Sequence, residues 1–368
     1  MKVGMASAYF CLMRGGGEYY TLYLSRALAR IGCDIHIICG RGILGKPSPL
    51  SEEFPLHLAA QLFALREWAM KGGLVSPILW RVHEYSYAAS SRRKMTAGYD
   101  VIHAHDPGSQ IAALGRGKKW PPVVATLHGP PSKRLARRLR RADAVLAVSK
   151  NVASKARGLG VECLVVEPGV DTEIFHQRER ETCKRGANLE GTVVLSVARL
   201  VPIKGLQFLV EAMTRVRKEI PDAKLVLVGE GSSRRSLEAF ARSTGATDMV
   251  RFEGYVPHER LSEYYSAASA FVLPSFYESF SMTTLEAMAS GCPVIVSASV
   301  RASMRIPDGS AIVVDPGSAE ALAEATLSLL RDEGKSRELS ERGVSFARRF
   351  DWNERASVVK AVYDQVTK

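Results

Sequence analysis

The sequence has no long apolar run. Among its 368 residues no stretch of about eighteen apolar side chains occurs, the length that a membrane-spanning helix requires. The opening residues MKVGMASAYFCLMRGGG also lack the extended apolar segment of a secretory signal peptide. We therefore expect neither a transmembrane helix nor a signal peptide, and the length suits two globular domains.

Cysteine is scarce, and its spacing carries no pattern. The six cysteines are scattered, without a CxxC pair or a Cys/His arrangement typical of metal ligands. Such cysteines are typical of small buried side chains in a reducing compartment. We expect a cytoplasmic protein.

Acidic residues are fewer than basic ones. The chain has 50 Lys and Arg against 38 Asp and Glu, which gives a net charge of +12. This balance favours an anionic partner, either nucleic acid, anionic lipid or a phosphorylated ligand. Charge alone does not choose among the three.

Apolar segments typical of buried strands alternate with helical patterns along the chain. This alternation predicts an α/β fold of two doubly wound Rossmann-like domains facing a central cleft, residues 1–180 and 186–350, with a polar linker at 176–190. The strands are expected in segments 2–8, 33–40, 99–105, 122–129, 143–149, 164–169, 191–200, 223–231, 249–256, 269–275, 292–298 and 311–316. Between residues 41 and 100 the pattern is less regular, and we expect helices at 56–70 and 76–95.

Two glutamates stand at one strand end. The strand at 269–275 is followed by Glu278 in a loop and then by Glu286 in a helix that Gly291 and Pro293 terminate. Ligands of doubly wound folds bind at this edge of the sheet, and the free N–H groups at the start of a helix bind anions. The two carboxylates and these N–H groups could hold a sugar, a diphosphate and a ribose in that order. The alternative is that Glu286 is a surface residue and Glu278 only caps the helix.

Two cations follow another strand of the second series. Arg199 and Lys204 lie in the loop after the strand at 191–200, where they could stabilise a departing diphosphate. The alternative is solvated surface charge. Gly229 lies in a further close-approach turn. The chain contains no Asp-x-Asp pair, so we expect no metal at the diphosphate.

Three features of the first domain leave alternatives open. The run Gly15–Gly17 fails the G-x-G-x-x-G spacing, and is either a phosphate-approach loop or a surface turn. His103 and His105 share one face of a strand, which favours strand-end packing or acceptor contact over a metal site. His128 by itself would be an ordinary strand-end histidine.

The segment KRLARRLRR, 133–141, is the most basic in the chain. Its arginines recur with helical spacing and predict one charged face, formed by Arg134, Arg137, Arg138 and Arg141. Such a face could contact an anionic membrane surface or a phosphorylated acceptor, or could simply be solvated. Nucleic-acid binding is disfavoured because no aromatic residues interleave the basic run.

Taken together, these motifs resemble the retaining GT-B glycosyltransferases of family four (glycosyl transferases group 1). The segment ESFSMTTLEAMASGCPVIVS resembles their signature of two glutamates separated by seven residues. Other segments follow in the family's order, namely RGGGEYYTLYLSRALARIG, YDVIHAHDP, VVATLHG, ADAVLAVS, EPGVDTEIF, VARLVPIKG, LVLVGEG and VRFEGYVP. The last segment, about 351–368, resembles the helix that crosses back to the first, acceptor-side domain in that fold.

The resemblance implies a role for each matching residue. Glu278 would contact the donor sugar and Glu286 the ribose, while the diphosphate would be bound by Arg199, Lys204 and the N–H groups of Met282 and Thr283. Gly16 would let the backbone approach the diphosphate. His128 would stabilise the developing oxocarbenium ion. No cofactor or metal is implied.

Three positions depart from the family pattern. Ser281 and Pro168 replace a usual glycine and asparagine, and ASVRASMRIPDGS replaces a usual GG-x-x-E. The predicted function is metal-independent transfer of a hexose-type sugar from a nucleotide sugar to a saccharide or lipid-linked glycan of the cell surface, at the inner face of the membrane. The alternatives are a non-catalytic protein that binds polyanions or membranes, and a sugar-nucleotide epimerase.

Overall fold

The computed structural model describes residues 1–42, 52–61, 76–96, 98–113 and 120–368. The chain divides into two compact units, one of residues 1–169 with 352–368 and one of residues 170–351. The boundary expected at residue 180 is too late. Val170 donates its N–H to the carbonyl of Phe350, and Phe175 is buried in the second unit's core.

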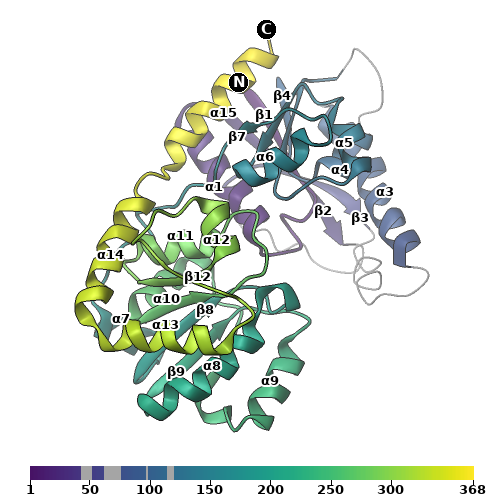
Figure 1. Cartoon of the computed structure of the whole chain (residues 1–368). Coiled ribbons are helices and arrows are strands. Elements are labelled where there is room, and N and C mark those ends of the chain that lie inside the picture. The colour runs from purple at the N-terminus through teal and green to yellow at the C-terminus, as the bar shows by residue number, and fades with distance from the viewer. Residues whose placement is uncertain (43–51, 62–75, 97, 114–119) are drawn as a thin grey trace. The chain divides into compact units, whose positions relative to one another are not determined.

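A parallel sheet of seven strands forms the centre of the first unit, in the order β3-β2-β1-β4-β5-β6-β7 (Figure 1). The strands are β1 (Lys2–Ser7), β2 (Asp34–Gly42), β3 (Leu56–Gln61), β4 (Val101–Ala104), β5 (Val123–Leu127), β6 (Ala144–Ala147) and β7 (Leu164–Val165). The helices of its described residues are α1 (Gly16–Arg30), α3 (Ser76–Met95), α4 (Pro107–Ala113), α5 (Lys133–Leu139), α6 (Lys150–Arg157) and α15 (Trp352–Val366). The helix expected at 76–95 is confirmed.

Strand β3 corrects one prediction. Its sequence LHLAAQ begins the segment 56–70, for which a helix was expected, and residues 62–70 lie outside the described part. Leucine, alanine and glutamine favour helices locally. Parallel pairing with β2, which sets Leu58 opposite Cys39, outweighs that preference at the edge of the sheet.

The second unit is built on a parallel sheet of six strands, in the order β10-β9-β8-β11-β12-β13. All six strands of the second series were predicted; they are β8 (Thr192–Val197), β9 (Ala223–Val228), β10 (Val250–Gly254), β11 (Ala270–Leu273), β12 (Val294–Ser297) and β13 (Ile312–Val314). The principal helices are α7 (Arg180–Ala187), α8 (Leu206–Glu219), α9 (Arg234–Ser243), α10 (Leu261–Ala267), α11 (Met282–Ala289), α12 (Ala298–Met304), α13 (Ala319–Arg331) and α14 (Glu333–Ala347). Helix α7 occupies the segment expected to be a linker.

Both faces of this second sheet are buried, which explains the uninterrupted apolar runs in the sequence. Along β8, Val193 and Leu195 pack on one face with α10, α11 and α14, whereas Val194 packs on the other with α8, α9 and α13. The unit is therefore doubly wound. Within the described residues, no helix is both long enough and apolar enough to cross a membrane.

Candidate active site

The loop after β11 leads directly into helix α11. Ser281 is the N-cap of α11, and its hydroxyl accepts a hydrogen bond from the N–H of Thr284 at 3.3 Å. The φ angle of Ser281 is −102°, so the backbone does not need the glycine that is usual here. The N–H groups of Met282 and Thr283 lie in the first turn, where a helix offers them no internal acceptor.

Glu278 and Lys204 form an ion pair at this strand end. The ammonium of Lys204 donates to Oε1 of Glu278, which also accepts a hydrogen bond from the Ser275 hydroxyl at 2.9 Å. The two side chains are only 13% and 11% exposed. Because Ser281 is the residue that caps the helix, the interpretation of Glu278 as a mere capping group is wrong.

A glycine brings the two loops together. Lys204 ends a short 3-10 helix, Pro202–Lys204, and Gly205 follows it with a φ of +65°. A Cβ atom on Gly205 would lie 2.4 Å from the carbonyl oxygen of Pro274. The N–H of Phe276 donates to the carbonyl of Ile203 at 2.9 Å, which fixes the loop of Lys204 beside the loop of Glu278.

Arg199 and Gly229 lie near the same edge of the second sheet. Arg199 is exposed, and within the described chain its side chain has no ion-pair partner. Gly229 has a close neighbour inside the protein, since a Cβ there would lie 2.0 Å from the carbonyl oxygen of Ala198. The close packing of two loops by itself requires a glycine at position 229, whether or not a ligand approaches there.

Glu286 is buried and has two partners that the sequence did not reveal. Its side chain is 4% exposed, and its oxygens bond to Nε2 of His258 and to the hydroxyl of Tyr265, each at 2.9 Å. Burial and the nearby carboxylate raise the pKa of Tyr265 well above its ordinary value. The surface interpretation of Glu286 is wrong. The partners escaped prediction because they belong to other segments and follow no motif.

In the first unit the glycine loop lies beside His128. Gly16 begins α1 and is exposed, while a Cβ on Gly17 would lie 3.9 Å from the His128 ring. Burial lowers the pKa of His128 to about 4, so the ring is neutral near pH 7. His128 therefore supplies polar atoms here without a positive charge.

His103 and His105 stack together, with ring centroids 4.4 Å apart. The nitrogens of His103 bond to the hydroxyls of Tyr363 on α15 and Thr126, both at 2.6 Å. His103 is thus a packing residue, as expected. Among the described residues, no group of three potential ligands could hold a metal ion.

The basic segment only partly forms the expected face. Helix α5 ends at Leu139, so Arg141 lies outside it. Arg138 is half-buried and donates to the carbonyl of Gly108 at 2.6 Å, and Arg134 contacts the hydroxyl of Tyr85 at 3.4 Å. The four-arginine helical face is therefore wrong in its geometry: the helix stops too early for the last arginine, and Arg138 bonds inward.

Comparison with known proteins agrees with these features. The profile of glycosyl transferases group 1 matches residues 177–346, and that of glycosyltransferase family 4 matches residues 14–174. The D-inositol 3-phosphate glycosyltransferases of Acidothermus cellulolyticus and Xylanimonas cellulosilytica are each 29% identical to this chain. The alignments cover 96% of this chain in both cases, and 86% and 92% of the relatives.

Solved structures show the same fold. Sucrose-phosphate synthase from Thermosynechococcus elongatus is 24% identical, with a TM-score of 0.83 over 99% of this chain and 98% of that one. HepE of Anabaena, solved with UDP-glucose, is 19% identical, with a TM-score of 0.76 over 98% of this chain and 100% of that one. The two profiles together match most of the chain, which is a glycosyltransferase with the GT-B fold and belongs to glycosyl transferases group 1, family four.

Proposed function

We propose that this enzyme moves a hexose-type sugar from a nucleoside-diphosphate sugar to a saccharide or lipid-linked glycan, with retention and without a metal ion. The observation that carries the proposal is the Lys204–Glu278 pair at the start of α11. It sets a cation, a carboxylate and unbonded helix N–H groups at the ligand-binding edge of a doubly wound sheet.

The second unit carries most of the donor chemistry. The diphosphate is bound by Lys204, Arg199 and the N–H groups of Met282 and Thr283, whose positive charge stabilises the leaving group. Lys204 turns from Glu278 towards the phosphate when the donor binds, and Glu278 then contacts sugar hydroxyls. Glu286 takes the ribose, sharing its oxygens with His258 and Tyr265, since each carboxylate oxygen can accept more than one hydrogen bond.

The transfer needs no covalent enzyme intermediate. The bond from the anomeric carbon to the diphosphate oxygen breaks, and the acceptor oxygen attacks from the same face. The acceptor's proton passes to the leaving phosphate. The roles proposed for Gly16 and His128 of the first unit rest on the family resemblance: the backbone at Gly16 approaches the diphosphate, and the neutral imidazole of His128, or its backbone, faces the developing oxocarbenium ion.

UDP-glucose is the first donor to test, because HepE is described with it, and an inositol phosphate is a second acceptor class, because the relatives are named for it. A cytoplasmic location at the inner membrane face, through exposed Arg137 and its neighbours on α5, is a further part of the proposal.

A panel of nucleotide sugars, scored for nucleotide release with and without EDTA, tests the proposal. We expect release from one donor, unaffected by EDTA and lost in Glu278→Ala and Lys204→Ala. The matched control is Arg215→Ala, which removes an exposed ion pair to Glu320 in the same unit. No release and no nucleotide binding from any donor would refute it. NMR of the product's anomeric proton tests retention separately.

A further inference from the structure

A cavity of about 380 Å³ lies in the second unit, away from the candidate active site. Thr192 begins β8, Ser269 directly precedes β11 and Pro293 directly precedes β12, and all three line the cavity. The cavity therefore lies at the amino edge of the sheet. Glu278 and Lys204 follow strand ends at the opposite, carboxyl edge, so the cavity is a separate site.

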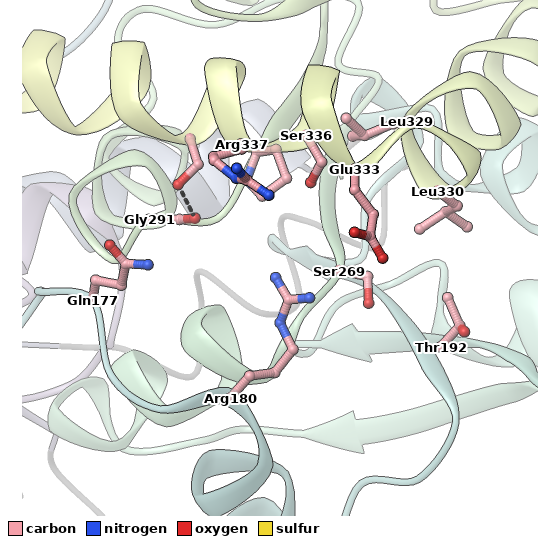
Figure 2. A pocket seen from close by; sticks show the side chains of 12 residues that line it. Gln177, Arg180, Thr192, Ser269, Gly291, Leu329, Leu330, Glu333, Ser336 and Arg337 are labelled. Atoms are coloured by element: carbon pink, nitrogen blue, oxygen red, sulfur yellow. Dashed lines mark hydrogen bonds between the residues drawn. The ribbon is translucent and has the colours of Figure 1, made fainter.

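Two arginines face each other across this cavity. Figure 2 shows the guanidinium group of Arg180 projecting into it from α7 and that of Arg337 projecting into it from α14. Neither arginine has an ion-pair partner within the described chain. The neighbouring carboxylate of Glu179 is occupied by its own helix, because it accepts the N–H groups of Glu181 and Thr182.

The carboxylate of Glu333 also points into the cavity (Figure 2), but among the described residues it forms no ion pair with either arginine. Two guanidinium groups that face one cavity are suited to a phosphate, which arginine binds through paired N–H groups. The remaining walls offer hydroxyl, amide and carboxylate groups for sugar hydroxyls, and a few apolar carbons, from Gln177, Thr192, Ser269, Leu329, Leu330, Glu333 and Ser336. The volume lies within the range of small-molecule sites.

An unsatisfied hydroxyl gives an independent indication of a ligand. A second cavity of about 310 Å³ shares Gln177, Arg180 and Gly291 with the first, and Ser290 lines it. Ser290 is 1% exposed and its hydroxyl has no hydrogen-bond partner. Leaving a buried hydroxyl unpaired is costly, so a polar ligand atom that reached it from the smaller cavity would gain a hydrogen bond that the chain does not supply.

Helix α11 connects the two edges of the sheet. Its N-cap, Ser281, belongs to the candidate active site, and its C-cap, Ser290, lines the smaller cavity. Ser340 of α14 donates to the carbonyl of Gly291 at 2.7 Å, which fixes the wall that carries Arg337 to the end of α11 (Figure 2). A ligand that draws Arg180 and Arg337 together would therefore act on this helix.

We propose that the cavity between α7 and α14 is an effector site for a hexose monophosphate, with the phosphate between Arg180 and Arg337 and coupled through α11 to donor binding. The coupling to donor binding rests on the proposed function, whereas the binding of a hexose monophosphate to the cavity does not depend on it.

Calorimetric titration of the full-length protein with glucose 6-phosphate, without nucleotide, tests the binding. We expect saturable binding that falls about tenfold or more in Arg180→Gln/Arg337→Gln, because charge-assisted hydrogen bonds are lost. The matched control is Arg235→Gln/Arg242→Gln on α9, which removes two exposed arginines of the same unit that form no ion pair within the described chain. Unchanged melting temperatures show that the variants fold.

Further titrations distinguish recognition of the phosphate from recognition of the sugar. Inorganic phosphate should compete weakly, and glucose alone should not bind. Ser290→Ala should keep the melting temperature of the unliganded protein, because its hydroxyl has no partner to lose, yet weaken binding of glucose 6-phosphate. Absent binding, or equal binding in the double variant and the wild type, would overturn the site. Equal affinity for inorganic phosphate would overturn its assignment to a sugar phosphate.

Coupling is measured by titrating UDP with and without saturating glucose 6-phosphate. The dissociation constant for UDP should change several-fold in the wild type and stay constant in Arg180→Gln/Arg337→Gln. A constant value in the wild type would overturn the coupling. Because the first titration contains no nucleotide, its result stands even if UDP does not bind.

Discussion

The two units place different kinds of polar groups near their candidate ligand-binding residues. In the first unit, the imidazoles of His103, His105 and His128 stack together, and burial lowers the pKa of each. In the second unit, Lys204 and Glu278 form an ion pair that is largely shielded from water. One unit thus has a neutral ring, that of His128, as its candidate ligand-binding side chain, and the other has opposite charges.

In the proposed function, this difference gives the two units different roles in the reaction. A departing diphosphate gains negative charge, which a fixed cation stabilises and a neutral ring does not. An oxocarbenium ion, which is positive, is better faced by neutral imidazole or carbonyl oxygens than by imidazolium. Removing a charge from the second unit and altering a ring of the first should therefore have different effects.

The largest effect should follow from removing the cation. Lys204→Met keeps the aliphatic stem but removes the charge, and should lower kcat/KM by roughly 10²–10³-fold, the usual cost of losing one transition-state donor. Steady-state kinetics measure it, with Arg215→Met, from an exposed pair in the same unit, as the control. A loss below threefold would mean that Lys204 has only a structural part.

Removing the carboxylate should separate binding from turnover. In Glu278→Gln, Lys204 loses its ion-pair partner, so UDP should bind several-fold more tightly. Turnover should fall about tenfold to 10²-fold, because the sugar loses its charged hydrogen-bond acceptor. The control is Glu320→Gln, and the measurements are UDP titration and kcat. Weaker UDP binding in the variant would contradict the proposed exchange of partners.

The histidine stack should make the first unit sensitive to acid. Burial holds the pKa of His103 at about 3, below its ordinary value of 6.5, so the unfolded chain takes up the proton first. The free energy of unfolding that depends on this neutral, buried ring is therefore highest above about pH 6.5, and it declines as the pH falls towards 3. His103→Gln, which can still bond to Tyr363 and Thr126, should reduce the fall in melting temperature between pH 7.5 and 5.

The matched control for that experiment is His176→Gln, which changes an exposed histidine. It should leave the dependence on pH as it is in the wild type. An equal slope in His103→Gln and the wild type would show that another group governs the acid sensitivity.

The sequence was sufficient for what depends on local pattern, and insufficient for what depends on pairing between distant segments. Apolar runs predicted the strands around Val193 and Val272 because both faces of the sheet are buried. Strand β3 was missed because its residues prefer helices and only the neighbouring strand makes them extended. The enclosure of Glu286 by His258 and Tyr265 likewise depends on tertiary structure, and no spacing in the sequence signals it.

The smallest effect should follow from restoring the usual glycine at the start of α11. Ser281→Gly should lower stability by only a few tenths of a kcal/mol and change UDP affinity less than about twofold, because the backbone is already unstrained and glycine is an adequate N-cap. Ser281→Ala should cost about 1 kcal/mol, since alanine caps poorly. Urea unfolding and UDP titration of both variants measure this. A large gain in UDP affinity for Ser281→Gly alone would instead mean that the serine side chain obstructs the donor. This position would then add to the difference between the charged edge of the second unit and the neutral rings of the first.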